Sequence, residues 1–452
     1  MTSSRRRLVA AACVGNLLEW YDFAVYALFA RYIAASIFHS SDGFSQLAQS
    51  LLVFGLGAVV RPLGAILIGR FADRNGRGAA LTATCLLMGA GTLMIVCDPP
   101  YETGGRLSIV IICVARVLQG LSAGGEIGGA AALLTEQASK GSRNMTASFL
   151  QATMGLSNML GATVATLATM CLDQAQMTAW GWRLPFVLGL LIVPMGLILR
   201  RAPAFAGSAI IPAQSGTPVL KTLLTQYQPS LGIAFGLSVL WTAAPYALVI
   251  ALPLYMQTAF NVSSHASYAA YLAANVALVI ASLLSGHLAD RYGPRPVMTC
   301  GMLVLILVPT PLLLLAGAFS QQLVITLVMI VLFGTVGLFA GAAPAGLASL
   351  FPPAVRATGI AAPYNAAAAI FGGFAPMVLT LLGPHWHGVP SPALYVLLAA
   401  VPAGLALCAP FWRQSGHRFQ LDKAMGHATE SITPDSPDDG TVSAGSRKGE
   451  RL

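Results

Sequence analysis

The chain has 452 residues, of which 56% are hydrophobic and only 9% carry a formal charge. A soluble surface needs about a quarter of its residues charged, so this composition excludes an ordinary water-soluble protein and predicts a chain that lies in a lipid bilayer. The net charge of +9 does not predict nucleic-acid binding, because the basic residues are spread singly or in pairs between apolar segments.

Apolar stretches of membrane-spanning length recur along almost the whole chain. About 20 helical residues cross the hydrocarbon core of a bilayer. The hydrophobic pattern therefore predicts an all-α membrane protein with twelve spanning helices. These are expected at residues 8–38, 46–70, 80–97, 107–135, 145–171, 183–200, 229–259, 267–289, 297–318, 321–349, 359–382 and 391–412.

The longest connection between the predicted spans, residues 201–228, contains several prolines and divides them into two sets of six. We expect it to be a loop that joins two helix bundles, residues 1–200 and 229–412. Residues 413–452 are rich in Ser, Asp, Gly and Lys and poor in apolar residues, which is typical of a disordered tail.

The connections between the spans differ in charge. Basic residues fall on alternate connections, and the opposite connections carry almost none. The positive-inside rule therefore predicts that both termini of this multi-pass protein lie in the cytoplasm. The expected location is a bacterial-type inner (plasma) membrane. The basic residues that set this orientation are Arg5 to Arg7, Arg74, Arg77, Lys140, Arg143, Arg200, Arg201, Lys221, Arg291, Arg295, Arg356, Arg413, Arg418 and Lys423.

Loop sequences recur in the two halves of the chain at nearly the same spacing. Gly69–Arg77 after the second span is matched by Gly286–Arg295 after the eighth. Arg143 after the fourth span is matched by Arg356 after the tenth. Parallel repeats of this kind are typical of transporters in which two bundles rock around a central site.

Each copy of the repeated loop contains an acidic residue followed by bases. We expect the acid to bond to a helix end of the facing bundle in one conformation and to release it in the other. The residues expected to form this gate are Asp73, Arg74, Arg77, Asp290, Arg291, Glu136, Arg143 and Arg356.

Asp, Glu, Lys and Arg residues inside the predicted spans lie only in the first half of the chain. A carboxylate in the bilayer interior is costly unless it is paired or neutral, so embedded acids are candidates for function. Proton coupling through a carboxylate is therefore expected to use Asp22, Glu19 or Glu126. The embedded bases are Arg31, Arg61 and Arg116.

The acids of the first span share one helix face with Tyr26, because Glu19, Asp22 and Tyr26 follow each other at steps of three and four residues. A pair of Asp22 or Glu19 with Arg116 would make a proton-sensitive switch. The alternative is a permanent ion pair that locks two helices together.

Embedded guanidinium groups favour an anionic substrate, because each offers a planar fork to a carboxylate. We expect Arg116 to play this part, whereas Arg61 is expected to reach the membrane surface or to pair with Glu19 or Glu126. The predicted substrate-binding residues are Arg116, Gln119, Tyr26, Asn16, Tyr364 and Asn365.

The segment Gly120–Gly124 matches the G-x-S-x-G pattern of hydrolases, but it lies inside a predicted span and not at a strand-to-helix turn. Its glycine pairs predict close packing of neighbouring helices instead. The seven cysteines include no CxxC pair and no metal-ligand spacing. We therefore expect no enzyme activity, no catalytic residue, no metal and no cofactor.

Several segments together resemble the major facilitator superfamily, and specifically its metabolite:proton symporter family. They are Gly15–Phe23, Arg61–Arg77, Arg116–Glu126, Trp180–Phe186, Phe351–Arg356, Tyr364, Asn365 and Phe371–Gly373. The resemblance implies a twelve-helix fold that imports citrate-like acids, dicarboxylates, 2-oxoglutarate, shikimate, or proline and betaine with protons. It also implies that Asp22 and Arg116 serve coupling and substrate charge. Asp73 and Arg77 would serve the cytoplasmic gate.

The sequence departs from that family at Ser349 and at Arg201–Phe205, where an acid is usual. The leading hypothesis is a proton-coupled secondary transporter that imports a small organic acid anion by alternating access. The alternatives are proton symport of a zwitterionic osmolyte such as proline or betaine, and efflux of a metabolite or drug by antiport. The expected partners are the substrate, protons and the bilayer, with no nucleic acid and a monomeric chain.

Overall fold

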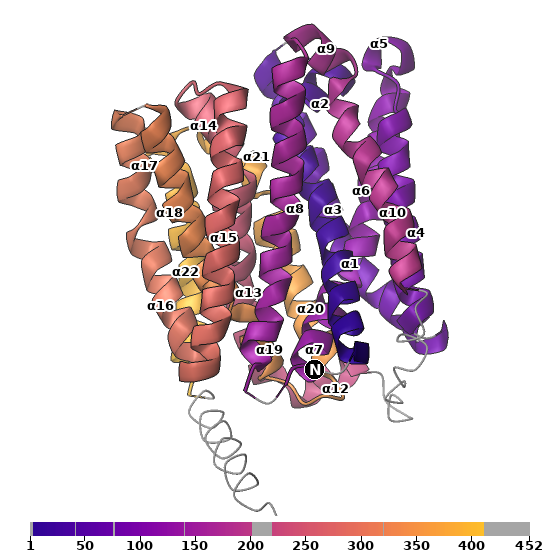
Figure 1. Cartoon of the computed structure of the whole chain (residues 1–452), viewed down its shortest axis with the longest axis vertical. Coiled ribbons are helices and arrows are strands. Elements are labelled where there is room, and N and C mark those ends of the chain that lie inside the picture. Colours follow the sequence, from indigo (N-terminus) through magenta and orange to yellow (C-terminus); the bar gives the residue numbers. More distant parts are fainter. Residues whose placement is uncertain are drawn as a thin grey trace, which may run out of the picture. The chain divides into compact units, whose positions relative to one another are not determined.

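The structure is a computed structural model, and its described backbone is almost entirely helical (Figure 1). The described residues are 3–40, 42–75, 77–139, 141–200, 219–319 and 321–410. In the first half, the helices are α1 (Ser3–Leu28), α2 (Ala30–Ile37), α3 (Gly43–Asn75), α4 (Arg77–Cys97), α5 (Tyr101–Gly104), α6 (Arg106–Gly124), α7 (Ile127–Glu136), α8 (Arg143–Cys171), α9 (Gln174–Ala179), η1 (Gly181–Arg183) and α10 (Leu184–Arg200).

The second half repeats this helical organisation and adds one short antiparallel hairpin, in which His385 pairs with Pro390 and Trp386 with Val389. Its elements are α12 (Val219–Gln226), α13 (Gln228–Pro245), η2 (Tyr246–Ile250), α14 (Leu252–Ala259), α15 (Ser264–Tyr292), α16 (Pro294–Leu307), α17 (Pro309–Ala318), α18 (Gln322–Ala340), α19 (Ala343–Ala348), α20 (Arg356–Ala367), η3 (Ala368–Gly372), α21 (Ala375–Leu382), β1 (His385–Trp386), β2 (Val389–Pro390) and α22 (Ser391–Cys408).

Each of the twelve predicted spans falls on one helix or on consecutive helices. Within the described residues, nine helices are long and apolar enough to cross a membrane, and Thr82–Cys97 is a shorter apolar helix. The last helix ends at Cys408, a few residues before the predicted end. The predicted central loop contains the short helix α12, and its residues 201–218, like the predicted tail, lie outside the described residues.

Several spans are interrupted within their length. α6 ends at Gly124, and α7 begins only at Ile127. In the second half, the π-helical turns η2 and η3 join α13 to α14 and α20 to α21. Pro253 and Pro376 lie in the first turn of the helix that follows each π turn, where their missing N–H costs no hydrogen bond. Such turns bend helices and are frequent at functional sites.

The two halves pack against each other along two lines of helices. α15 lies along α8, and α20 with η3 lies along α3. Close approach depends on glycine: a Cβ on Gly286 would collide with Ser148, and one on Gly373 would collide with Ala58. We call the end of the helices at which α1 begins the lower end, as drawn in Figure 1, and the opposite end the upper end.

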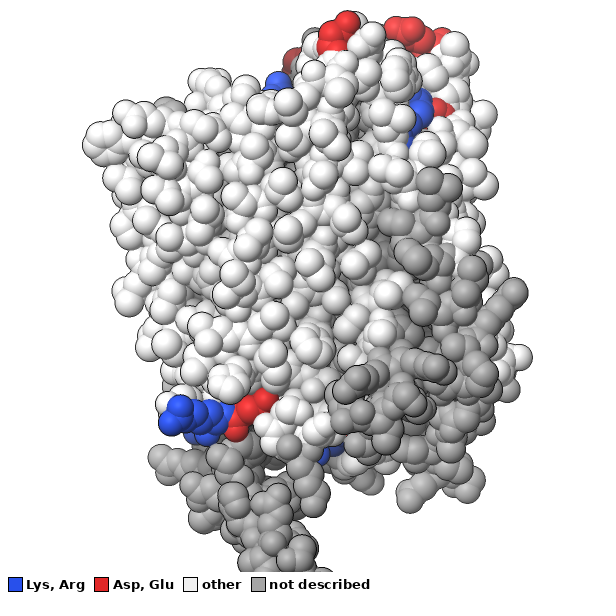
Figure 2. Space-filling view, viewed as in Figure 1, with Lys and Arg blue, Asp and Glu red and all other residues white. Residues whose placement is uncertain are grey.

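Charged side chains on the face drawn in Figure 2 lie near the two ends, and the described surface between them is uncharged. Large apolar side chains of the spanning helices are exposed, such as Leu307, Leu323 and Leu405. An apolar belt with charged ends is what a bilayer requires of a helical bundle, because lipid cannot solvate charges.

The backbones of α3 and α6 approach closely at two glycines of α6. A Cβ on Gly120 would collide with the carbonyl oxygen of Gly57, and a Cβ on Gly124 would collide with that of Arg61. These contacts confirm the close helix packing that the glycine pairs predict. They also fix α6 against the stretch of α3 that carries Arg61.

We expect Gly124→Val to destabilise the purified protein by about 1–3 kcal/mol, because the added side chain forces α3 and α6 apart. Gly129→Val is the matched control, since Gly129 lies in the same span and a Cβ there meets no atom within 4 Å. Thermal unfolding in detergent measures both variants. Equal losses of stability would show that helix propensity, and not the α3–α6 contact, is responsible.

Candidate functional site

Four buried ionisable side chains form a centre in the first bundle, which we call the central cluster. They are Glu19 and Asp22 of α1, Arg61 of α3 and Arg116 of α6, and none is more than 3% exposed. The i, i+3 spacing of the two acids puts them on one face of α1. Ionisable groups so far from solvent are retained only where they are paired or used, so the central cluster is the candidate site.

Glu19 forms an ion pair with Arg61. Its Oε1 accepts a hydrogen bond from Arg61 Nη2 at 3.1 Å. This pairing is one of the possibilities expected for Arg61. The Tyr364 hydroxyl of the second bundle also lies close enough to interact with the Arg61 guanidinium. The pair therefore joins α1 to α3 and faces α20.

Asp22 reaches Arg116 through Gln119 and not by a direct ion pair. Gln119 donates from Nε2 to Asp22 Oδ2 at 3.1 Å, and its Oε1 accepts from Arg116 Nη1 at 2.6 Å. The Thr92 hydroxyl of α4 donates a short hydrogen bond to the same carboxylate oxygen of Asp22. A side-chain amide thus relays between the acid and the base that the sequence predicts as partners.

The Arg116 guanidinium is enclosed by three aromatic rings, an arrangement that we call the Arg116 cage. Its Cζ lies 4.8 Å from the ring centre of Phe23, 4.4 Å from that of Tyr26 and 5.1 Å from that of Phe54. Cation–π contacts attract the cation but leave its N–H groups free to donate. Nε and Nη2 have no hydrogen-bond partner in the described structure. Because buried donors are almost always bonded, these two groups indicate a place for an acceptor ligand.

Aromatic residues of the second bundle lie against the central cluster. The ring of Tyr246, on η2, lies 5.9 Å from Trp20 and 6.2 Å from Phe54. Its buried hydroxyl has no hydrogen-bond partner among the described residues. The Trp241 ring lies 4.7 Å from Tyr364. Among its described residues, the second bundle therefore contributes hydroxyl and aromatic groups to the centre, but no charge.

The two predicted asparagines bond to other groups than the central cluster. Asn16 donates to the Leu150 carbonyl oxygen at 2.8 Å and to Thr153 Oγ1 at 2.7 Å. Asn365 donates to the Gly124 carbonyl oxygen at 2.8 Å, across the two bundles. Of the predicted substrate-binding residues, the structure brings together Arg116, Gln119, Tyr26 and Tyr364.

Sequence reasoning missed several residues of this centre. Thr92 and Phe54 look like ordinary core residues in the sequence, and nothing in their spacing distinguishes them. Trp20 lies within the Gly15–Phe23 segment that resembles the family, but nothing there marks it as a site residue. Trp241 donates from Nε1 to Gln151 Oε1 at 3.3 Å and so links α13 to α8. A polar amide within an apolar span was the available signal for Gln151.

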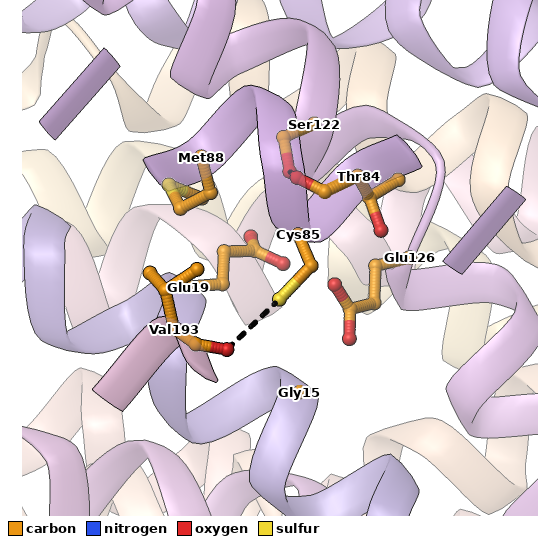
Figure 3. Close-up of a pocket in the computed structure, with 8 residues that line it drawn as sticks. All are labelled: Gly15, Glu19, Thr84, Cys85, Met88, Ser122, Glu126 and Val193. Carbon is orange, nitrogen blue, oxygen red and sulfur yellow. Dashed lines mark hydrogen bonds between the residues drawn. The ribbon is translucent and has the colours of Figure 1, made fainter. Parts of the chain in front are cut away.

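A small pocket inside the first bundle brings together two of the predicted proton-coupling residues (Figure 3). Glu19 and Glu126 line it, and their carboxylates are drawn on either side of Cys85. The remaining lining residues are Gly15, Thr84, Met88, Ser122 and Val193. Its volume of about 10 Å³ corresponds to roughly one water molecule. The pocket lies within one bundle, whereas the Arg116 cage faces the second bundle through Phe54 and Tyr246.

Asp290 joins the two bundles at the lower end. It lies on the last turns of α15 and accepts hydrogen bonds from the backbone N–H groups of Asn144 and Met145, at 2.7 and 3.0 Å. The side chain of Asn144 donates to the same carboxylate at 2.9 Å. These are the first free N–H groups of α8, so the carboxylate lies at the positive end of that helix.

A second contact between the bundles at the lower end is an ion pair. Arg356 Nη1 lies 2.9 Å from Glu136 Oε1, which joins α20 to α7. Of the other predicted gate residues, Arg143 and Arg291 are exposed. The side chains of Asp73, Arg74 and Arg77 lie outside the described part of the structure.

The contacts between the bundles at the upper end use different chemistry. Tyr268 donates from its hydroxyl to the Leu28 carbonyl oxygen at 2.5 Å, across the bundles. An apolar cluster lies nearby and contains Ala30, Leu47 and Leu51 of the first bundle with Leu254 and Met377 of the second. Contacts at both ends therefore hold the bundles together in this conformation, with the central cluster buried between them.

Family descriptions match both halves of the chain. The description "Sugar (and other) transporter" matches residues 8–203, and the description "Major Facilitator Superfamily" matches residues 233–434. The two matches are separated by most of the predicted central loop. Each match covers one of the two sets of six predicted spans.

Curated relatives match over most of their own length. The chain is 31% identical over 405 residues to the citrate-proton symporter of Klebsiella pneumoniae, covering 89% of this chain and 90% of that protein. It is 34% identical over 387 residues to the alpha-ketoglutarate permease of Escherichia coli (strain K12), covering 84% and 88%. It is 28% identical over 408 residues to the proline/betaine transporter of the same strain, covering 88% and 81%.

Among solved structures, the xylose transporter XylE from E. coli in a partially occluded inward open conformation has the same fold. The TM-score is 0.68 at 17% identity, and the match covers 90% of this chain and 97% of that one. The chain therefore belongs to the major facilitator superfamily, as its motifs predict. It is a multi-pass membrane transporter and not an enzyme.

Proposed function

We propose that this chain imports a small organic acid anion, citrate-like or a dicarboxylate, together with protons. The observation that carries the proposal is the Arg116 cage, in which a fully buried guanidinium keeps Nε and Nη2 without a partner in the described structure. Those two N–H groups form one edge of the guanidinium, which can donate to both oxygens of a carboxylate. The relatives named for citrate and alpha-ketoglutarate support the same substrate class.

A second carboxylate of the substrate would lie near Arg61. Both guanidiniums lie against the ring of Phe23, Arg61 at 4.5 Å and Arg116 at 4.8 Å from its centre. Arg61 Nε has no partner among the described residues, and the Tyr246 hydroxyl is also without one. The guanidiniums of Arg61 and Arg116, beside the Tyr246 hydroxyl, suit a molecule with two acidic groups better than a molecule with one.

Proton coupling would use the carboxylates of the first bundle. Asp22 is linked to Arg116 through Gln119, so a change of its charge is felt at the anion site. Glu19 and Glu126 line a pocket of about one water molecule, through which a proton could move without opening the space between the bundles. We assign Asp22 to coupling and the two glutamates to proton transfer.

Alternating access would separate the contacts at the two ends in turn. The lower end would face the cytoplasm with both termini, as the alternating basic connections indicate. The bacterial relatives support an inner-membrane location. Asp290 and the Glu136–Arg356 pair would close that side. Tyr268 and the apolar cluster of Ala30 and Leu254 would close the other. The monomer is the expected functional unit.

We expect Asp290→Ala to open the lower end more often, because it removes three hydrogen bonds that hold α15 on α8. The loss of such a cap is worth about 0.5–2 kcal/mol, or up to roughly 30-fold in an opening equilibrium. A cysteine placed at the buried position Ser148 should therefore react several-fold faster with a thiol reagent. Asp42→Ala is the control, because Asp42 accepts from Ser45 at a helix start without joining the bundles. An unchanged rate for Asp290→Ala would contradict the gate.

A zwitterionic osmolyte is the second candidate substrate, since the proline/betaine transporter also matches. Uptake of labelled citrate and 2-oxoglutarate into vesicles, with proline and betaine as competitors, separates the two. We expect the acids to accumulate when an inward proton gradient is imposed and the osmolytes not to compete. Competition by betaine alone would favour the second candidate, and accumulation independent of the gradient would exclude the coupling.

A further inference from the structure

Asp98, directly after α4 at the upper end, is a buried carboxyl group outside the central cluster. It is 2% exposed, and neither of its carboxyl oxygens has a hydrogen-bond partner among the described residues. The Arg183 guanidinium binds the backbone instead: Nη2 donates to the Asp98 carbonyl oxygen at 2.7 Å and Nη1 to the Ala179 carbonyl oxygen at 2.8 Å. Its Cζ also lies 4.2 Å from the ring centre of Trp182. Arg183 thus holds the loop without pairing with the carboxylate.

A carboxyl in this position is poorly suited to carry a charge. An ionised carboxylate that is removed from water without donors around it loses its hydration and gains nothing in return. Binding a proton removes the charge and most of that cost. Burial accordingly raises the pKa of Asp98 to about 7, although the Arg183 guanidinium acts to lower it.

The charge of Asp98 reaches the central cluster through Tyr26. The carboxyl lies close enough to the Tyr26 hydroxyl for their charges to interact, and the same tyrosine ring packs on Arg116 at 4.4 Å. The loop 98–106 also carries the ionisable residues Tyr101, Glu102 and Arg106. Tyr101 stacks on His39 of the loop before α3, which also carries the exposed Asp42. Glu102 and Arg106 are exposed, so water screens them from Asp98.

We propose that Asp98 is a proton-binding site at the upper end and that its protonation favours entry of an anion into the Arg116 cage. An ionised Asp98 places negative charge beside Tyr26, where it repels an approaching anion, and a protonated Asp98 does not. The site is separate from the carboxylates that we assign to coupling. Its effect on anion entry rests on the proposed function, whereas proton binding by Asp98 does not.

Infrared difference spectroscopy of the purified protein tests proton binding without any substrate. We expect a protonated-carboxyl band that disappears as the pH rises through about 7. Asp98→Asn should abolish this band, and Glu102→Gln should leave it, because Glu102 is an exposed carboxyl in the same loop. A band that survives in Asp98→Asn would overturn the assignment.

Removal of Arg183 gives a second, signed test of the same site. The guanidinium lowers the pKa of Asp98, so Arg183→Gln should move the midpoint of the band to higher pH, and Arg183→Lys should move it back. A midpoint that moves to lower pH would contradict the proposal.

Stability provides a check, because a folded-state pKa raised above the unfolded value makes stability fall as the pH rises through that interval. Asp98→Asn should therefore gain more heat stability above the midpoint than below it.

Binding of labelled citrate and 2-oxoglutarate at different pH values tests the link to the Arg116 cage. In the unmodified protein, affinity should fall about 3- to 10-fold as Asp98 ionises, and Asp98→Asn should keep the high affinity. A titrating band with no effect of Asp98→Asn on affinity would leave the proton site in place and overturn the link. Failure of both acids to bind would overturn the link together with the proposed substrate class, while the infrared result would still decide the proton site.

Discussion

Replacement of Arg116 by lysine should lower uptake of the organic anion at least about 100-fold, although the charge is kept. The ammonium group of lysine is compact and cannot offer two parallel N–H groups to a carboxylate, nor can it fill the space between Phe23, Tyr26 and Phe54. A bidentate, charge-assisted pair in a site without water is worth several kcal/mol, which is the size of this loss. Initial rates of uptake into vesicles measure it.

The matched control for this prediction is Arg31→Lys. Arg31 lies on the exposed side of α2 at the upper end, so the same chemical change there should leave uptake close to that of the unmodified protein. Abundance of each variant in the membrane corrects for folding. If Arg116→Lys transports citrate and 2-oxoglutarate normally, the anion site lies elsewhere.

Replacement of Asp22 by asparagine should abolish accumulation driven by a proton gradient. We expect the accumulated amount to fall about tenfold or more, which is the factor that one pKa unit represents in a protonation equilibrium. Asparagine has nearly the shape of aspartate and can still accept from Gln119 and Thr92, but it cannot bind or release a proton. Exchange of labelled for unlabelled substrate without a gradient should fall much less than accumulation. The ratio of the two rates is the measured quantity.

Glu19→Gln and Glu126→Gln distinguish the roles of the three acids in the same assay. Loss of Glu19 also leaves Arg61 without its 3.1 Å partner, so we expect this variant to lose stability as well as coupling. Asp42→Asn, at an exposed acid, should behave as the unmodified protein. If Asp22→Asn still concentrates substrate against its gradient, Asp22 does not carry the coupling.

The spans and the bonding of an acid to a helix end at the lower end could be predicted from the sequence. Twelve apolar runs separated by polar connections leave little choice of architecture, because each run must satisfy its backbone inside lipid. The repeated loop predicted that an acid would bond to a helix end of the facing bundle. Asp290 does bond to the first N–H groups of α8. Its counterpart Asp73 lies outside the described side chains, so that half of the prediction stays a prediction.

The sequence left the pairing of the central charges open, with Glu19 or Glu126 as partner of Arg61 and Asp22 or Glu19 as partner of Arg116. Periodicity puts Glu19 and Asp22 on one face of α1, but which arginine each acid meets depends on the rotation of α3 and α6. That rotation is set by the contacts of Gly120 and Gly124 with α3. Gln119 lies between Asp22 and Arg116 for the same reason.

Asp98 shows a second limit of sequence reasoning. In the sequence it is one acid in a short polar connection, and such residues are usually solvated. In the fold it is buried and contacted by Arg183, which is far along the chain and donates to its carbonyl oxygen. The aromatic rings of the Arg116 cage show the same limit. In the sequence, Phe23 and Phe54 cannot be distinguished from any other phenylalanine that faces lipid or the core.

The most direct test of proton-coupled import is a measurement of proton movement when substrate is added. Purified protein is reconstituted into liposomes that contain a pH-sensitive dye, and citrate or 2-oxoglutarate is added outside with no imposed gradient. Proton-coupled import predicts that the interior acidifies as labelled acid enters, and that Asp22→Asn and Arg116→Lys both abolish the acidification. Entry of the labelled acid with no change of internal pH would contradict it.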